Sequence, residues 1–399
     1  MEAEREHIVI RGCGAISPLG IDEQSTSQAY LTGRPGISVI QHQGQATPVA
    51  ALSAAGEDAL RKLQTENPSY RQLDRSVLMA IYAARQATEQ AGWLNPQSDQ
   101  QNDLAVNIGS SRGATGLFEQ HYKNFQQQKL SASASPTTTL GNLSSWVGHA
   151  VHAGGAQISH SITCSTALMA VANGVAWLRA GMASRFLAGG TEAPLTDFTI
   201  AQMKAIGIYS GMHEAPYPCQ PYGTSGQNTF VLGEGAAVLA LEKVSSSQLI
   251  KGDVVIESVG FGFEQIKSKT GISADGLNFQ QSMRHALSQL PEHKQAIDVI
   301  ITHSPGTKAG DKAELFAIES LFKNNSPSIT TNKHLLGHTL GASGALSLQY
   351  ALHLLAQQQI TLLGYTSILP NKTPAAVNSI MVNAAGFGGN ATTVVLSIV

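Results

Sequence analysis

The stretch Ile158-Ser159-His160-Ser161-Ile162-Thr163-Cys164-Ser165-Thr166-Ala167 decides the fold class of this chain. Residues 158–163 predict an apolar strand that leads directly to Cys164, and small or apolar residues follow from Ala167 to Ala180 at the density of a helix. A strand that passes at once into a helix is the repeating unit of a layered α/β protein. We therefore expect a buried strand, a turn at Cys164 and a helix.

The same alternation of strands and helices extends in both directions. Helices are expected at 279–290 and 312–322. Further strands are expected at 7–10, 104–108, 183–188, 236–241, 254–256, 299–301 and 394–399, the last of which is expected to close the sheet. The polar linker Ser245-Ser246-Ser247 separates two similar stretches. The sequence thus predicts an α/β fold that is internally duplicated, with an N-terminal half at residues 1–245 and a C-terminal half at residues 246–399.

Composition excludes several classes of protein. The 399 residues carry 25 Lys and Arg against 27 Asp and Glu, and this balance argues against nucleic acid as a partner, because phosphate contacts need clustered cations. The low charged fraction of 13% is typical of a chain that hides part of its surface in an oligomer. No apolar run of about 18 residues occurs, and the first residues lack the apolar core of a signal peptide. We expect a cytoplasmic protein without a membrane segment.

The three cysteines, Cys13, Cys164 and Cys219, include no CxxC pair. They predict neither a disulfide framework nor a zinc site, and they indicate a reducing compartment.

Gly12-Cys13-Gly14 follows a predicted strand and is similar to the start of a dinucleotide-binding fingerprint. The third glycine of that fingerprint is missing, and Pro18 stands where its helix should begin. A tight structural turn is therefore expected at these glycines.

Gly109-Ser110-Ser111-Arg112-Gly113 matches the nucleophile elbow of the α/β-hydrolases. Ser111 would be the nucleophile, and Asp311 and His338 follow it in a permissible order. A serine hydrolase is therefore an alternative function from a different class.

Cys164 stands at the predicted start of a helix, where unsatisfied N–H groups stabilise a thiolate and can receive a developing oxyanion. His303 follows the predicted strand 299–302, and catalytic groups in α/β folds gather at such carboxyl ends. His338 lies among the small residues of the stretch Gly337 to Gly344, which predicts a tight, preformed loop. A buried structural cysteine is the alternative, but the two histidines favour a Cys-His-His site.

At these residues the chain resembles the β-ketoacyl-acyl-carrier-protein synthases, the condensing enzymes with the thiolase fold. The resemblance covers nearly the whole chain and implies a thiolase-like fold of duplicated αβαβα layers. The matching stretches are residues 12–20, 163–165, 302–307 with Gly310, Asp311 and Glu314, 333–344 and 383–390.

The resemblance implies a decarboxylative Claisen condensation without a cofactor or a metal. Cys164 would take an acyl group from an acyl carrier protein as a thioester. His303 and His338 would then donate hydrogen bonds to the thioester carbonyl of malonyl-acyl carrier protein as carboxylate departs. The backbone amides of Cys164 and Phe387 would form an oxyanion hole.

Further roles follow from the same resemblance. Lys333 and Glu314 would form an ion pair that orients His338, and Phe387 would gate the access to Cys164. Lys62 and Arg71 are candidates for contact with the acidic carrier protein.

The chain departs from the family pattern at several positions. Ser304-Pro305 interrupts the first histidine motif, and Ala385 stands where a second phenylalanine is usual. Arg112 lies near a position that is apolar in relatives, and the stretch 221–229 lacks an arginine- and aspartate-containing motif. These departures indicate a divergent member, serving a specialised polyketide or polyene pathway rather than bulk fatty-acid synthesis.

Some relatives are non-catalytic chain-length partners that lack the nucleophile. The presence of Cys164, His303 and His338 disfavours that alternative. We expect an active synthase that forms a homodimer, or a heterodimer with a related synthase-like subunit.

Overall fold

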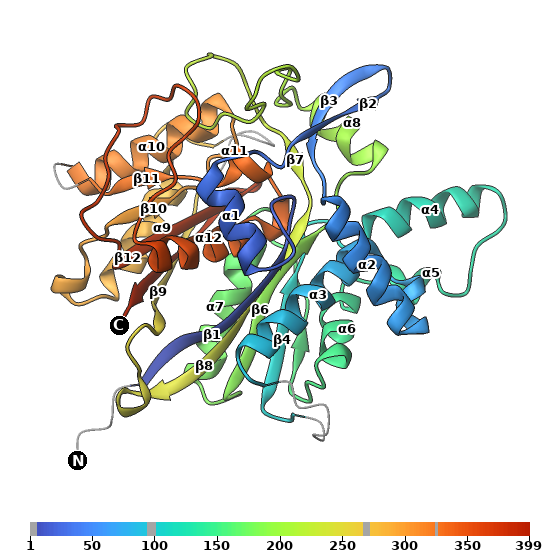
Figure 1. Cartoon of the computed structure of the whole chain (residues 1–399), viewed down its shortest axis with the longest axis horizontal. Coiled ribbons are helices and arrows are strands. Elements are labelled where there is room, and N and C mark those ends of the chain that lie inside the picture. Colours follow the sequence, from blue (N-terminus) through green and yellow to red (C-terminus); the bar gives the residue numbers. More distant parts are fainter. Residues whose placement is uncertain (1–5, 94–100, 266–271, 324–325) are drawn as a thin grey trace.

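A computed structural model describes residues 6–93, 101–265, 272–323 and 326–399 (Figure 1). Within these ranges, ten strands form one sheet in the order β11-β10-β12-β13-β9-β1-β8-β6-β4-β5. The N-terminal strands are β1 (Glu6–Ile16), β4 (Leu104–Gly109), β5 (Gln157–Ile158), β6 (Arg185–Glu192) and β8 (Gly235–Ser245). The C-terminal strands are β9 (Val254–Phe263), β10 (Val299–Ile301), β11 (Ser328–Thr330), β12 (Ser379–Gly386) and β13 (Asn390–Ile398).

The two sets of five strands repeat one pairing pattern. Strand β4 is parallel to β5 and β6, β6 is antiparallel to β8, and β8 is antiparallel to β1. In the same way β10 is parallel to β11 and β12, β12 is antiparallel to β13, and β13 is antiparallel to β9. Strands β1 and β9 join the two sets through Val9 and Val255. The predicted internal duplication is therefore confirmed.

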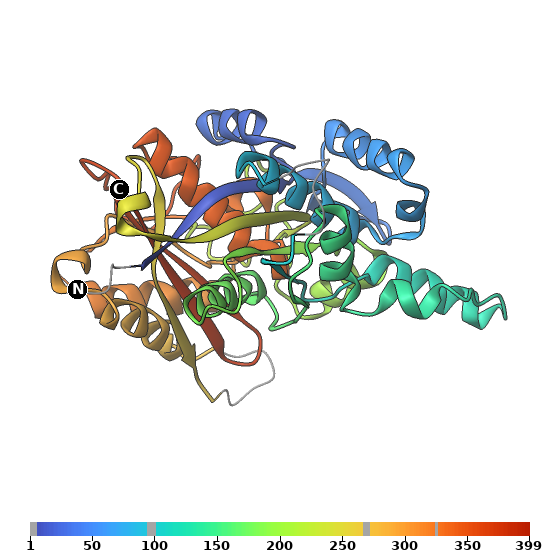
Figure 2. The ribbon, with the colours of Figure 1, turned by 90° about the horizontal axis from the view of Figure 1, so that it is seen from below.

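Helices fill three layers around these strands (Figures 1 and 2). One core joins α3 (Arg75–Gln90) and α6 (Asn142–Ala150) to the N-terminal strands, and another joins α9 (Leu277–Ser288) and α10 (Lys308–Phe322) to the C-terminal strands. Between the two sets lie α7 (Thr166–Arg179) and α12 (Ser343–Gln357), which belong to the largest core cluster. This arrangement is the duplicated αβαβα layering that the family resemblance implies.

The remaining elements lie around this body. A small sheet contains β2 (Ser38–His42), β3 (Gln45–Ala50) and β7 (Leu232–Gly233). The other helices are α1 (Glu23–Thr32), α2 (Ala54–Glu66), α4 (Thr115–Gln126), α5 (Ala134–Thr138), α8 (Asp197–Ala205) and α11 (Lys333–Leu336). Short 3-10 turns cover Pro68–Gln72, Ser246–Gln248, Glu292–Lys294 and Leu340–Ala342. In the part of the chain that the structure describes, no helix has the length and apolar character needed to cross a membrane.

The glycine turn predicted at residues 12–14 is wrong, because these residues lie inside β1. A Cβ atom at Gly14 would lie 2.0 Å from the carbonyl oxygen of Ala83, and one at Gly12 would lie 2.3 Å from that of Ala87. The glycines therefore serve close packing of α3 onto the strand. The chain turns later, where the Ser17 amide donates to the Gly20 carbonyl.

Other boundaries also differ from the prediction. The strand expected to reach Cys164 ends at Ile158, and Thr163, just before Cys164, adopts a φ of 53°, which lies outside the range of a strand. Helix α10 begins at Lys308 rather than 312, since the Thr307 hydroxyl caps it by accepting from the Gly310 amide. The strand near the C-terminus does not close the sheet, because β13 lies between β12 and β9.

Replacing Gly14 tests the packing of α3 on β1. Gly14→Val should lower the free energy of unfolding by roughly 3 kcal/mol, because its side chain meets backbone atoms that cannot move aside. Gly141→Ala is the control, since a Cβ there meets nothing within 4 Å at a φ of −59°. Urea unfolding measures both. Equal stability of the two variants would contradict the close approach.

Candidate active site

Cys164 lies in a strained turn immediately before α7, whose N-cap is Ser165. The strain is at Thr163, a β-branched residue in the left-handed region, which costs about 1–3 kcal/mol. Its carbonyl oxygen accepts from the hydroxyls of Ser111 (2.8 Å) and Thr166 (2.6 Å). These bonds hold the turn so that Cys164 stands at the start of the helix.

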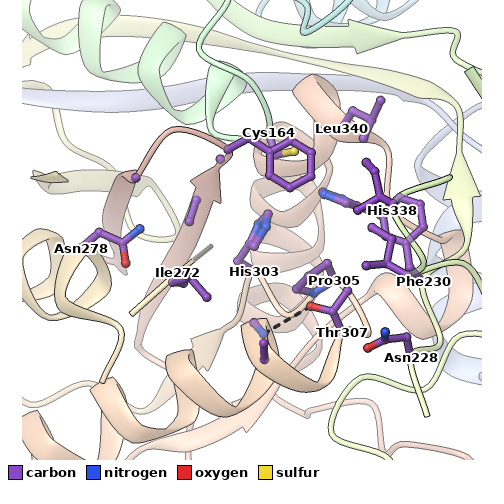
Figure 3. A pocket seen from close by; sticks show the side chains of 18 of the residues that line it. Cys164, Asn228, Phe230, Ile272, Asn278, His303, Pro305, Thr307, His338 and Leu340 are labelled. Atoms are coloured by element: carbon purple, nitrogen blue, oxygen red, sulfur yellow. Dashed lines mark hydrogen bonds between the residues drawn. The ribbon is translucent and has the colours of Figure 1, made fainter. Parts of the chain in front are cut away.

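His303 follows β10 by two residues, and His338 follows α11. The His338 amide donates to the Val231 carbonyl (2.7 Å), and its own carbonyl accepts from the Gly233 amide (3.0 Å). The two imidazole rings lie 5.1 Å apart, at an angle of 83°. Figure 3 shows both rings pointing into one cavity, with the sulfur of Cys164 at its top.

This cavity has a volume of about 370 Å³. Its wall is apolar at Met203, Ile206, Ile208, Phe230 and Leu340, and polar at Asn228, Glu264, Asn278 and Thr307. The structure thus brings together three predicted residues from distant parts of the chain around a hollow large enough for a small ligand.

Lys333 and Glu314 are both buried behind His303. The Lys333 ammonium donates to the Thr302 carbonyl (3.4 Å), and the Glu314 carboxylate accepts from the amides of His303 (3.0 Å) and Ser304 (2.8 Å). Among the described residues, the Lys333 ammonium and the Glu314 carboxylate do not form an ion pair within 4 Å. The predicted contact pair that orients His338 is therefore absent, and Glu314 instead fixes the backbone of His303.

The loop after β12 brings Phe387 to the nucleophile turn. A Cβ atom at Gly386 would lie 1.7 Å from the Thr163 hydroxyl and 3.0 Å from the Cys164 amide nitrogen, so only glycine permits this approach. The Thr163 hydroxyl donates to the Phe387 carbonyl (3.3 Å). The Phe387 side chain is 42% exposed and lines the cavity, so it is not a packed core aromatic.

Comparison with protein families agrees with this geometry. The family model described as beta-ketoacyl synthase, N-terminal domain, matches residues 5–247, and the model for the C-terminal domain matches residues 254–363. The chain belongs to the β-ketoacyl synthase family. It is therefore a condensing enzyme of the acyltransferase class, active in fatty-acid or polyketide biosynthesis.

Relatives match over nearly the full length of this synthase. A 3-oxoacyl-acyl-carrier-protein synthase 2 of Coxiella burnetii is 27% identical over 423 residues, which cover 99% of each chain. Among solved structures, the ishigamide ketosynthase/chain length factor has a TM-score of 0.84 at 22% identity, covering 99% of this chain and 100% of that one. A type II PKS acyl-carrier protein in complex with its ketosynthase gives 0.85 at 19%, with the same coverage. These structures share the fold.

The hydrolase alternative is wrong for this synthase. The Ser111 hydroxyl donates to the Thr163 carbonyl, and the Asp311 carboxylate accepts from the amides of Tyr222 (2.9 Å) and Gly306 (3.1 Å). Neither the Ser111 hydroxyl nor the Asp311 carboxylate forms these hydrogen bonds with His338, so the three residues do not make up a serine triad.

The residues that mark this synthase as divergent lie in different places. Ala385 lines the cavity. Arg112 is not among the described residues that line it, because its guanidinium turns to the side-chain oxygen of Gln202 on α8. Lys62 and Arg71 are exposed on α2 and on the turn that follows it.

Some supporting residues were missed by the sequence analysis. The Asn383 amide donates to the Glu314 carboxylate (3.2 Å) and accepts from the Thr393 hydroxyl (2.8 Å). The Ser165 hydroxyl donates to the Asn390 side-chain oxygen. Both asparagines stand in the motif at 383–390, but nothing in that motif indicates which group they contact.

Burial controls the protonation of the histidines. It lowers the pKa of His303 and His338 well below 6.5, and the cation of Lys333 lowers both further. Both rings are thus neutral at physiological pH, and each keeps one N–H to donate. Burial also raises the pKa of Glu314 and lowers that of Lys333, while the attraction between their charges opposes both shifts.

The thiol of Cys164 is not the resting thiolate that its place before a helix predicts. Its pKa is raised to about 12, mainly by burial and in part by the nearby carboxylate of Glu192, while Lys333 opposes the shift. Desolvation of the charged sulfur is the largest of these effects.

The rate of Cys164 alkylation by iodoacetamide tests this protonation state. Because only the thiolate reacts and the pH lies far below the pKa, the rate should rise about tenfold per pH unit from pH 7 to 9. Mass spectrometry of the Cys164 peptide measures it. A rate that levels off below pH 8.5 would show a resting thiolate.

Proposed function

We propose that this synthase joins an acyl group held on Cys164 to malonyl-acyl carrier protein with loss of carbon dioxide. The observation that carries the proposal is the placement of two neutral, buried histidines beside the Cys164 sulfur in one cavity. A general base or a metal hydroxide is not needed for such a reaction, because departure of carboxylate itself generates the carbanion.

In the first half-reaction, the Cys164 sulfur attacks the carbonyl of an acyl thioester. A new carbon–sulfur bond forms, the bond to the carrier breaks, and the thiol proton passes to the departing carrier thiolate. The amides of Cys164 and Phe387 are proposed to receive the transient oxyanion, which the approach of Gly386 to Cys164 supports.

In the second half-reaction, the carbon–carboxylate bond of the malonyl group breaks and carbon dioxide leaves. The electron pair moves into an enolate, whose oxygen accepts hydrogen bonds from His303 and His338. The enolate carbon attacks the Cys164 thioester, and the sulfur regains a proton from solvent. The product is a 3-oxoacyl chain two carbons longer. Lys333 is proposed to keep both imidazoles neutral and to stabilise the enolate by its charge.

The proposed carrier is an acyl carrier protein, and a solved relative holds such a protein against its ketosynthase. Lys62 and Arg71 are the proposed contacts, since both are exposed cations. The similarity to polyketide ketosynthases supports a specialised polyketide pathway, and the retained Cys164 favours an active subunit over a chain-length partner. We also propose the division at residues 245 and 246, which the repeated strand pattern supports.

A second synthase-type chain is the proposed partner of an exposed face of α4. Phe118, Tyr122 and Phe125 recur there at helical spacing, and each is more than half exposed. Figure 1 shows α4 projecting from the body, and β5 is the last strand at this edge of the sheet among the described residues. Both features are typical of a surface that a partner covers.

Substitution of the nucleophile and of each histidine tests the proposed division of roles. Cys164→Ala should lower acyl transfer to the enzyme by roughly a thousandfold or more. His303→Ala and His338→Ala should each lower condensation by roughly 100-fold or more but acyl loading far less. Mass spectrometry of the loaded enzyme and of the product measures the two steps.

The control is His353→Ala, which removes a buried imidazole outside the cavity and should leave both steps unchanged. Acyl loading on a residue other than Cys164, or equal loss of both steps in the histidine variants, would refute the assignment.

The dimer face is tested by charge substitutions on α4. Tyr122→Glu combined with Phe125→Glu should convert a dimer into a monomer in light-scattering measurements, because two carboxylates cannot be buried against an apolar partner. Phe316→Glu, at a similarly exposed position on α10, should leave the dimer intact. Dissociation by Phe316→Glu alone would place the interface elsewhere.

A further inference from the structure

Glu192, at the end of β6, is a fully buried carboxylate that the proposed reaction does not use. Its position in the middle of the protein requires explanation, because moving a carboxylate out of water is costly unless its oxygens are satisfied. Among the ion pairs of the described residues, none neutralises it. The groups that contact this carboxylate are therefore neutral hydrogen-bond donors and not an oppositely charged side chain.

Four donors surround this carboxylate. One oxygen, Oε1, accepts from the Ser110 hydroxyl (2.8 Å) and the Arg112 amide (3.1 Å). The other, Oε2, accepts from the amides of Ser111 (2.8 Å) and Gly341 (2.9 Å). Burial raises the pKa of Glu192, and these hydrogen bonds lower it because they favour the charged form of the carboxyl group.

The two segments that Glu192 joins each lead to a proposed catalytic residue. On one side, the Ser111 hydroxyl donates to the carbonyl of Thr163, the residue before Cys164 (2.8 Å). On the other side, Gly341 belongs to the loop that begins at His338. The carboxylate thus connects the nucleophile turn to the histidine loop through two short paths.

Close packing at Gly341 supports this connection between the two segments. A Cβ atom at Gly341 would lie 2.5 Å from the Ser111 amide nitrogen and 2.7 Å from Oε2 of Glu192. Residue 341 therefore has to be glycine for the loop to reach the carboxylate. The negative charge held there also acts on the Cys164 sulfur, whose pKa it raises.

We propose that Glu192 is a positioning residue that fixes the distance between the nucleophile turn and the His338 loop. This inference rests on the proposed roles of Cys164 and His338.

Glu192→Gln tests this positioning role, with the labelling of Cys164 as a second readout. The amide keeps the size of the side chain but removes the charge and turns one acceptor into a donor that faces backbone N–H groups. The condensation rate constant should fall roughly 10- to 100-fold, because small displacements in a catalytic site have effects of that size. Iodoacetamide should label Cys164 roughly threefold faster or more at pH 8, because a nearby negative charge is gone. Slower condensation together with faster labelling of Cys164 is therefore the result that the proposal predicts.

Asp298→Asn is the matched control. The Asp298 carboxylate also accepts hydrogen bonds from backbone amides of another segment, those of Asn378 (2.8 Å) and Ser379 (2.9 Å). It lies at the start of β10, away from the cavity. It should change neither rate. Thermal melts of each variant show that faster labelling does not come from unfolding.

Ser110→Ala is the milder second variant, since it removes one of the four donors and leaves the charge in place. It should lower condensation roughly tenfold or less without faster labelling. Unchanged condensation and labelling in folded Glu192→Gln would overturn the inference while leaving Cys164 as the nucleophile. Acyl transfer that survives in Cys164→Ala would instead overturn the proposed function itself.

Discussion

The burial of a few side chains determines the protonation of the groups around this cavity. Burial lowers the pKa of His303, His338 and Lys333 and raises that of Cys164, while nearby acidic groups raise the pKa of Lys333. The same burial strengthens each hydrogen bond to a developing negative charge. Such a site suits the proposed condensation, which needs no strong base.

The duplicated fold explains why the parts of this site meet. Cys164 stands before α7 and His338 stands in the loop before α12, which are equivalent helices of the two halves and lie together in the middle layer. His303 follows β10, the central parallel strand of the C-terminal set, and Phe387 follows β12. Each half therefore supplies the end of one central helix to a common cavity.

Much of this arrangement could be predicted from local patterns. The strand–helix alternation indicated the layered fold, and the placement of Cys164, His303 and His338 at element ends indicated a site. Contacts that depend on three-dimensional packing could not be predicted in this way. The glycines at positions 12 and 14 suggested a turn, yet they lie in β1 and allow α3 to pack closely against that strand. Glu314 and Lys333 had the charges of an ion pair, yet their orientation is set by backbone amides and by the Thr302 carbonyl.

The loop of Phe387 is tied to the nucleophile turn by two bonds, from the Thr163 hydroxyl to the Phe387 carbonyl and from the Ser165 hydroxyl to Asn390. These residues flank Cys164 on either side. Displacement of the loop therefore disturbs the alignment of the sulfur, and thermodynamic linkage makes the relation reciprocal. By the same reciprocity, any free energy with which a group on that sulfur favours one arrangement of the turn also favours one position of the loop.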